Sequence, residues 1–184
     1  MERSKSVGKR CAVCVFCGSS PGSNAIYAAT ARRLGELIGR NGYSLVYGGG
    51  ATGLMGEVAR SALASGAAVI GIRPTLLNHL EPPEANIDMR YVPDLFERKR
   101  QMIAGSDAFI VLPGGMGTLD ELFEVVTTAQ LDVHDKRIVV VNTNGYFAPF
   151  FTLIRHLQEA GFLYRDPMGL FHVVEDADQA ITFL

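Results

Sequence analysis

The sequence lacks any long run of charge of one sign. Its longest basic run is Arg98-Lys99-Arg100, the formal net charge is −2 and the isoelectric point is near 6.1. A protein that binds nucleic acid normally carries a basic face that pairs with phosphates. We therefore expect no nucleic-acid partner.

A long apolar run is also missing. The polar segment 1–10 leads into a short apolar stretch between Cys11 and Cys17. That stretch is too brief to span a bilayer, and no small-residue cleavage site of a secretory leader follows it. We expect no membrane partner and a cytoplasmic location, with residues 1–9 flexible.

Cysteine is scarce and confined to one segment. Cys11, Cys14 and Cys17 have C-x-x-C-x-x-C spacing, which in a loop suggests a metal or redox site. The segment is β-rich, however, and in a strand residues three apart point to opposite faces. The four histidines are scattered without ligand spacing. We therefore read the cysteines as small buried hydrophobes and expect no metal site.

What the sequence does contain is the composition of a folded domain. Hydrophobic residues make up 48% of its 184 residues and charged residues 20%, so one core can form and residues 1–184 are expected to be a single domain. Apolar β-rich runs alternate with helical patterns, which predicts a Rossmann-like α/β fold, a doubly wound parallel sheet of about seven strands. Strands are expected near 11–17, 43–47, 67–72, 89–92, 108–112, 138–141 and 171–174, and helices near 24–40, 54–65, 95–106, 119–132, 147–160 and 177–183.

Three glycine-rich loops follow predicted strands, at residues 18–22, 48–53 and 113–118. In open α/β sheets, ligands bind beyond the carboxyl ends of the strands. Each loop ends at a predicted helix start, where free N–H groups attract an anion and glycine permits close approach. The three loops together predict a phosphorylated ligand, although each alone could simply form a tight turn. From the first two loops, the candidate contacts are Ser19, Gly48 and Gly49.

Two nucleotide-binding motifs can be compared with these loops. No lysine follows the glycines in the Walker pattern, which excludes an ATP-hydrolysing P-loop. Gly48, Gly50 and Gly53 match G-x-G-x-x-G, which leaves a dinucleotide fold as a competitor. It is the weaker alternative, because the position about twenty residues further on, where an acid should bind ribose, falls near Gly66 and Ala67.

The third loop leads directly into a helix with acidic residues in its first turns. Thr118 and Glu121 have the spacing of a capping box, in which the glutamate reaches back to the N–H of the cap residue. Alternatively, Glu121 faces a bound sugar, where a fixed anion stabilises an oxocarbenium-like transition state or orients water. Both interpretations stay open at this point.

A second charged site lies on the helix that we expect after Asp94, a predicted N-cap. At 100° per residue, Lys99 falls at the centre of an apolar face and Arg98 at its edge. A buried lysine requires a partner, whereas Arg100 on the far side is expected in solvent. Arg98 could reach a phosphate, a ribose hydroxyl or a carboxylate through its planar fork. The other members of this face are Leu95, Phe96, Met102, Ile103 and Ser106.

Residues 113–121, read with Arg98-Lys99 upstream, resemble the PGGxGTxxE motif of the Lonely guy family. These proteins are cytokinin-activating phosphoribohydrolases, many of them long labelled as lysine decarboxylases. The resemblance covers nearly the whole chain and includes residues 16–20, 46–50 and 53–56.

The resemblance implies hydrolysis of N6-substituted adenosine 5′-monophosphates (cytokinin riboside monophosphates), or of AMP, to the free base and ribose 5-phosphate. It implies no metal or organic cofactor, and a homodimer. Arg98 and Glu121 would be the catalytic pair, and Glu81 is placed only by the match of Pro74-x-x-Leu77. The other implied contacts are Gly115, Gly117 and Thr118 with the phosphate, Lys99, Glu81 and Thr127 along the site, and Gly114, Met116, Leu119 and Asp120 with the substrate.

Some positions depart from the commonest family pattern. Met116 stands where tyrosine is frequent, residues 95–96 are Leu-Phe where Met-His is usual, and Thr128 replaces a common tryptophan, which leaves the base preference open. The decarboxylase label conflicts with chemistry, because pyridoxal phosphate needs a Schiff-base lysine and only Lys99, better suited to an ion pair, lies near the site. A non-catalytic carrier of a nucleotide or molybdenum cofactor remains the alternative. Such a carrier needs the loops but not Glu121.

Overall fold

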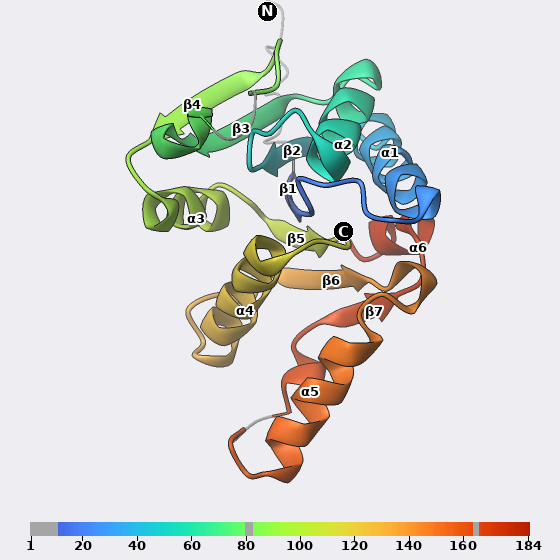
Figure 1. The fold of residues 1–184 in the computed structure, drawn as a ribbon, viewed down its shortest axis with the longest axis vertical. Helices are drawn as coiled ribbons and strands as arrows, with labels where there is room; N and C mark the ends of the chain where they lie inside the picture. The colour runs from blue at the N-terminus through green and yellow to red at the C-terminus, as the bar shows by residue number, and fades with distance from the viewer. Residues whose placement is uncertain (1–10, 80–82, 164–165) are drawn as a thin grey trace, which may run out of the picture.

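A single parallel sheet organises the chain (Figure 1). The computed structural model describes residues 11–79, 83–163 and 166–184, so the expectations for residues 1–9 and for Glu81 lie outside it. Its seven strands run in the order β4-β3-β2-β1-β5-β6-β7, and all neighbours pair in parallel, which confirms the predicted fold. The strands are β1 (Ala12–Phe16), β2 (Ser44–Tyr47), β3 (Val69–Pro74), β4 (Asp88–Val92), β5 (Ala108–Val111), β6 (Arg137–Val141) and β7 (His172–Val174).

Helices connect the strands at the predicted places. The main difference is the helix after β5, which begins at Met116 rather than near 119. None of the helices in the described ranges has the length and apolar character needed to cross a bilayer. The helices are α1 (Ala25–Arg40), α2 (Gly53–Ala64), α3 (Leu95–Ala104), α4 (Met116–Gln130), α5 (Ala148–Glu159) and α6 (Ala177–Ile181), with short 3-10 helices η1 (Thr75–His79), η2 (Thr143–Gly145) and η3 (Pro167–Gly169).

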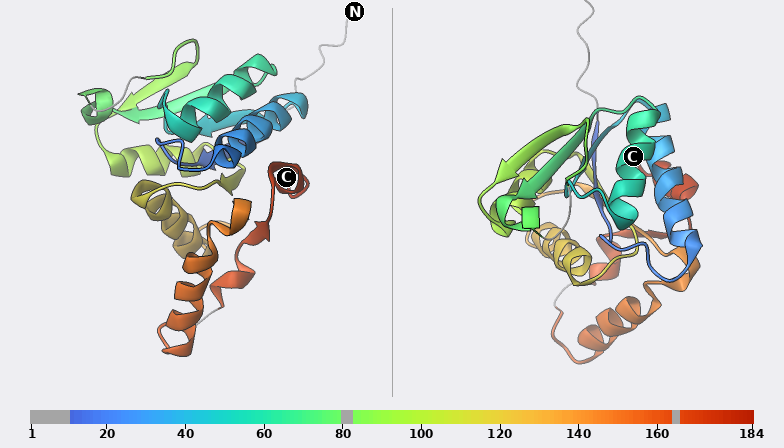
Figure 2. Two further views of the ribbon diagram at one scale, coloured as in Figure 1. Left: turned by 45° about the vertical axis from the view of Figure 1, so that its right-hand side comes forward. Right: turned by 45° about the horizontal axis from the view of Figure 1, so that its top comes forward.

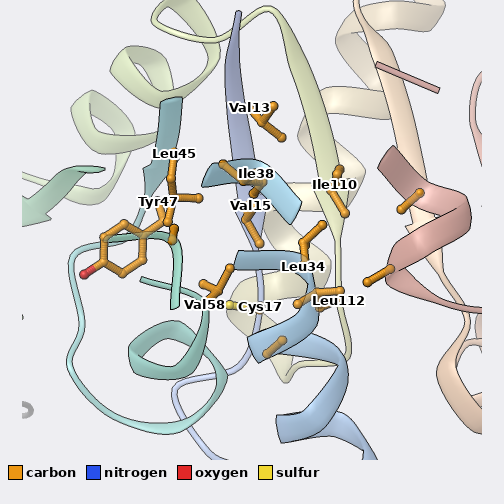
Figure 3. Packing of buried hydrophobic residues seen from close by; sticks show 14 of the residues in the cluster. Val13, Val15, Cys17, Leu34, Ile38, Leu45, Tyr47, Val58, Ile110 and Leu112 are labelled. Atoms are coloured by element: carbon orange, nitrogen blue, oxygen red, sulfur yellow. The ribbon is translucent and has the colours of Figure 1, made fainter. Parts of the chain in front are cut away.

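Helices cover both faces of the sheet (Figure 2), and a separate hydrophobic core lies on each face. Side chains of α1, α2 and α6 pack on one face, and those of α3, α4 and α5 on the other. Figure 3 shows Val13, Val15 and Cys17 on the α1–α2 side, whereas Cys14 packs on the opposite side. The thiols of Cys14 and Cys17 therefore lie on different faces, as the strand reading predicts. Within the described ranges, no three His, Cys, Asp or Glu residues are grouped to hold a metal ion.

The topology creates one crevice at the carboxyl edge of the sheet. β1 is flanked by β2 and β5. Strands β2, β3 and β4 are added in order on one side of β1, and β5, β6 and β7 are then added in order on its other side. The loops after β1 and β5 diverge toward opposite faces, and such a switch point is where ligands bind in doubly wound sheets. All three glycine-rich loops are thereby placed at this edge.

Close packing of α1 on α2 depends on Gly35. A Cβ at this position would lie 2.4 Å from the Val58 carbonyl oxygen and 2.9 Å from the Ala62 nitrogen. These contacts are with helix backbone, which cannot move aside as a flexible side chain could. The absence of a side chain at Gly35 thus sets the separation of the two helices.

Replacement of Gly35 by alanine should therefore destabilise the fold, although alanine is the better helix former. We expect a loss of about 1–3 kcal/mol in the free energy of unfolding, because overpacking costs more than the gain in helix propensity. Urea denaturation measures the change. Gly169→Ala is the matched control, since nothing lies within 4 Å of its added Cβ. Equal stability of Gly35→Ala and wild type would contradict the packing argument.

Candidate active site

A cavity of about 370 Å³ opens at the switch point. It is bounded by the end of β1, the start of α4, one side of α3, the first turn of α2 and the 3-10 helix η1. One side of it carries glycines and a helix start, another carries charged side chains, and the rest is apolar. The lining residues are Cys17, Gly18, Ser19, Met55, Leu77, Arg98, Gly115, Met116, Gly117, Thr118 and Glu121.

The start of α4 is open toward this cavity. Its N-cap is Gly115, which is extended and offers no side chain to cap the first-turn amides. A Cβ on Gly115 or on Gly117 would meet nothing within 4 Å, so space remains above these amides. Uncapped N–H groups at a helix start, together with the helix dipole, favour an anion. An anion site is therefore best placed here.

The other two helix starts are already satisfied internally. In α1 the Asn24 side chain accepts a hydrogen bond from the Ile26 amide. In α2 the Gly18 carbonyl accepts from the amides of Leu54, at 3.0 Å, and Met55, at 3.2 Å. The expectation that all three helix starts offer free amides is therefore wrong, because the loop after β1 uses those of α2 to anchor itself.

The capping-box prediction for Thr118 and Glu121 is also wrong. With Gly115 as the N-cap, both residues lie inside α4, and Thr118 is buried against the backbone. A Cβ at Gly114 would lie only 2.0 Å from the Thr118 hydroxyl oxygen, so this position requires glycine. The Glu121 side chain turns toward α3 instead of back to the helix start. Of the two interpretations considered for Glu121, the one that faces the cavity agrees with the structure.

Glu121 and Arg98 form a buried ion pair across α3 and α4. Arg98 Nη2 lies 3.0 Å from Glu121 Oε1, with the side chains only 14% and 6% exposed. Burial raises the pKa of Glu121 to about 7, although the Arg98 charge opposes this rise. Arg98 was predicted to reach a phosphate, a ribose hydroxyl or a carboxylate, and the group that it contacts in the structure is the carboxylate of Glu121.

Gly48 makes room for the guanidinium of Arg98. A Cβ at Gly48 would lie 2.1 Å from Arg98 Nη2, so a side chain at this position would displace the guanidinium from its place beside Glu121. Arg98 Nε is buried and has no hydrogen-bond partner within the part of the chain that the structure describes. A buried donor without a partner is costly, so this N–H is available to an oxygen of a ligand in the cavity.

Lys99 lies beside the pair but is directed along α4. Its Nζ contacts Asp120 Oδ2 at 3.0 Å and also Glu124, and its side chain is largely buried. Desolvation alone would lower the pKa of Lys99, but hydrogen bonds to Glu124 and Asp120 raise it overall. The ion pairing predicted for Lys99 is confirmed. A lysine held in its charged form is poorly suited to form a Schiff base.

The predicted interior face of α3 is wrong in the first turn of the helix. Leu95 and Phe96 were placed on the interior face with Met102, yet Phe96 is 80% exposed and Leu95 is exposed as well. Of the other members of that face, Met102 and Ser106 are buried and Ile103 is half-buried. Arg98 and Lys99 point toward α4 from the middle of α3, whereas the first turn, which carries Leu95 and Phe96, is exposed to solvent.

Several predicted contacts lie outside the cavity lining. Asp120 is exposed and pairs with Lys99, whereas Leu119 packs against the core. Thr127 is exposed further along α4, and Gly49 lies against Met89 and Arg73. Gly114 lines a neighbouring cavity on the other side of the loops after β1 and β5, together with Tyr27 and Tyr146. Contact of these residues with substrate stays a prediction.

Four lining residues were not predicted as contacts. Cys17 and Gly18 could have been predicted from the sequence, since they come directly after a strand at the carboxyl edge of the sheet, where ligands bind. Met55 and Leu77 could not have been predicted, because an apolar side chain in a helix or loop has the same sequence pattern whether it lines a core or a cavity. Their place depends on tertiary structure alone.

The fold and the cavity define a Rossmann-like α/β protein with an anion-favouring helix start beside a buried arginine–glutamate pair. A family model described as "Possible lysine decarboxylase" matches residues 55–184. The chain is 47% identical over 153 residues to a cytokinin riboside 5′-monophosphate phosphoribohydrolase of Arabidopsis thaliana, covering 82% of this chain and 71% of that protein. A second Arabidopsis protein of the same name is 42% identical over 164 residues, covering 89% and 75%. The chain belongs to this Lonely guy family of phosphoribohydrolases.

Solved structures with the same fold include molybdenum-cofactor proteins. The molybdenum cofactor binding protein of Rippkaea orientalis superposes with a TM-score of 0.71 at 20% identity, covering 96% of both chains. The molybdenum cofactor carrier protein of Chlamydomonas reinhardtii gives 0.72 at 22% identity, covering 95% of this chain and 96% of that one. At such identity the likeness shows the fold alone.

The buried carboxyl of Glu121 should make stability depend on pH. Its folded pKa of about 7 lies above the ordinary 4.5, so its contribution to stability is present below about pH 4.5 and is lost as pH rises through about 7. Glu121→Gln removes this titration. We expect the free energy of unfolding of the variant, relative to wild type, to rise by up to about 3 kcal/mol from about pH 5 to 8.

Urea denaturation at several pH values measures this difference. The exposed Glu159 provides the matched control, because its side chain lies in solvent at the end of α5. Glu159→Gln should show no comparable trend. If the free energy of unfolding of Glu121→Gln differed from that of wild type by the same amount at every pH, this carboxyl would have an ordinary pKa in the folded protein.

Proposed function

We propose that this chain hydrolyses the N-glycosidic bond of cytokinin riboside 5′-monophosphates, and of AMP, to release the free base and ribose 5-phosphate. The observation that carries the proposal is the buried Arg98–Glu121 pair beside the uncapped start of α4. The family membership supports the reaction class, since the relatives are named phosphoribohydrolases. A cytoplasmic location stays a prediction.

The 5′-phosphate would bind at the start of α4. The amides of the turn that follows Gly115 and the hydroxyl of Thr118 are the available donors. Glu121 lies three residues beyond Thr118, about 4.5 Å along the helix axis. This separation supports a position of the carboxylate beside the ribose when the phosphate of a nucleotide is bound at the helix start.

Glu121 would act on the sugar during bond cleavage. As the bond between C1′ and the base nitrogen breaks, positive charge develops on the ribose, and a fixed carboxylate stabilises that charge. A water oxygen then bonds to C1′, its proton is lost, and the departing base takes up a proton. Arg98 positions the carboxylate through the 3.0 Å contact, and its free Nε–H can donate to a substrate oxygen.

Purified protein should release free base from AMP and from N6-isopentenyl-AMP, and not from the corresponding unphosphorylated ribosides. Without the phosphate, the start of α4 has no anion to bind. In Glu121→Gln, turnover should fall by at least about a hundredfold, the scale for loss of one preorganised electrostatic group, while nucleotide affinity is largely retained. Chromatographic detection of the base and calorimetric titration with AMP measure the two quantities.

The same assay separates an enzyme from a carrier. A carrier on this fold needs the anion-binding loop but no carboxylate at the sugar. Nucleotide binding without base release would therefore support a carrier of a nucleotide or a molybdenum-type cofactor. Equal turnover by wild type and Glu121→Gln would refute the catalytic role of Glu121.

We further propose that the chain is a homodimer through the outer surface of α3 and the start of α4. Phe96 and Met116 are 80% and 83% exposed, and Tyr91 and Leu95 are exposed nearby. The pairs between Arg98 and Glu121 and between Lys99 and Asp120 hold the two helices side by side. An exposed apolar group of this kind is typical of a surface covered by a partner.

Phe96→Glu should convert the dimer to a monomer, because a desolvated charge would replace a central aromatic contact. Sedimentation equilibrium measures the mass in solution. Leu63→Glu provides the control, since Leu63 is an exposed apolar residue of α2, on the opposite side of the sheet. A wild-type monomer, or a dimer unaffected by Phe96→Glu, would contradict this interface.

A further inference from the structure

A tyrosine outside the active-site cavity holds the loop that leads into α4. Tyr146, which directly follows η2, donates a 2.5 Å hydrogen bond from its hydroxyl to the carbonyl oxygen of Gly114. Gly114 precedes Gly115, the N-cap of α4. The bond therefore joins the segment after β6 to the loop after β5, next to the helix start that favours an anion.

The turn before Tyr146 fixes where its side chain lies. Asn144 and Gly145 have left-handed φ angles of 54° and 71°, which asparagine and glycine adopt more readily than other residues do. The Tyr146 amide donates to the Thr143 carbonyl at 3.2 Å, and the next residue, Phe147, is buried in the core. A strained backbone of this kind persists only where the surrounding structure determines it. The turn thereby holds the Tyr146 hydroxyl at the loop before α4.

The same loop is also held from the side of β1. The Gly18 amide donates to the Pro113 carbonyl at 3.1 Å, so two successive carbonyls of the loop, those of Pro113 and Gly114, each accept a hydrogen bond from another segment. On the helix side, the Thr118 hydroxyl leaves no room for a Cβ at Gly114. Contacts with three other segments thus determine the backbone orientation of this loop.

The hydrogen bond from Tyr146 has a consequence for the next amide. The Gly114 carbonyl and the Gly115 N–H belong to one trans peptide unit, and in such a unit these two groups point in opposite directions. Gly115 lines both the active-site cavity and the neighbouring cavity, whereas Tyr146 is part of the lining of the neighbouring one. With its carbonyl directed at Tyr146, the peptide directs the Gly115 N–H away from the neighbouring cavity.

We propose that Tyr146 is a positioning residue for the phosphate in the proposed reaction. By holding the Gly114 carbonyl, it directs the Gly115 N–H toward the anion at the start of α4. This inference rests on the proposed function, in which the 5′-phosphate of the substrate binds there. Tyr146 acts through the loop and needs no contact with the substrate.

The effect of this positioning should fall on binding rather than on the chemical step. The 5′-phosphate is remote from the glycosidic bond, so its contacts are the same in the bound substrate and in the transition state. Loss of such a contact raises KM and leaves kcat unchanged. A misdirected amide weakens one hydrogen bond to the anion, which lowers affinity by about threefold to tenfold.

Tyr146→Phe tests the proposal, because it removes the hydroxyl and keeps the ring. We expect calorimetric titration to show affinities for ribose 5-phosphate and for inorganic phosphate that are about threefold to tenfold lower than in wild type. AMP hydrolysis should show KM raised by a similar factor, with kcat retained. The melting temperature should change little, because the ring still packs edge-on against Phe147.

Tyr27→Phe is the matched control. The Tyr27 ring lies edge-on to that of Tyr146, with ring centroids 5.6 Å apart, and it lines the same neighbouring cavity. Of these two hydroxyls, that of Tyr146 is the one bonded to the loop before α4. Removal of the Tyr27 hydroxyl should therefore leave phosphate affinity and turnover unchanged.

The outcomes separate this inference from the proposed function. Equal affinity of wild type and Tyr146→Phe for ribose 5-phosphate would overturn the positioning role. A parallel loss of kcat and melting temperature, or an equal effect of Tyr27→Phe, would also overturn it, since either result indicates general loosening. A wild type that binds ribose 5-phosphate but releases no base from AMP would overturn the proposed reaction, and the phosphate affinities of the variants would still decide the role of Tyr146. A wild type that binds neither phosphate probe would overturn both.

Discussion

The ion pair between Arg98 and Glu121 is the interaction on which the site depends. It joins α3 to α4, the two helices that enclose the cavity, and it lies where the chain switches direction across the sheet. Both groups are largely removed from water, and the Arg98 charge offsets only part of the desolvation cost, because burial still raises the pKa of Glu121 to about 7. Lys99, paired with Asp120 and Glu124, extends the same contact between the helices. Removal of one partner would therefore alter the shape of the cavity as well as its charge.

Glycine provides the space that this arrangement needs. Gly48 leaves room for the Arg98 guanidinium, and Gly114 leaves room for the Thr118 hydroxyl. Neither position lies at a positive φ angle, so the requirement is close approach rather than backbone conformation. The glycine-rich loops are thus only partly anion-binding elements. Of these three loops, only the one before α4 leaves its helix start open. The loop after β1 accepts hydrogen bonds from the first amides of α2, and Gly48 in the loop after β2 makes room for Arg98.

Much of the fold was predictable because local patterns and tertiary structure agree. Apolar runs such as 108–112 and 138–141 are buried on both faces, as strands of a covered parallel sheet must be. The errors arose where tertiary contacts override a local pattern. Thr118 and Glu121 fit a capping box, but α4 begins earlier and Arg98 offers the carboxylate a stronger partner. Helical periodicity placed Leu95 and Phe96 inside, but the first turn of α3 is exposed, whereas Met102, two turns further on, is buried in the core.

The candidate site was predictable only where its chemistry shows in the residue type. Arg98 and Glu121 attract attention because a charge on an interior helical face needs a reason, whereas Leu77 and Met55 resemble any core residue. What distinguishes Leu77 is the fully buried Arg73, whose hydrogen bond to its carbonyl fixes a short 3-10 helix at the cavity. The cavity thus combines the anion-favouring start of α4, the Arg98–Glu121 pair and apolar side chains. A nucleoside 5′-monophosphate consists of an anion, a sugar and a largely apolar base, so a lining of these kinds supports the proposal that such a molecule binds here.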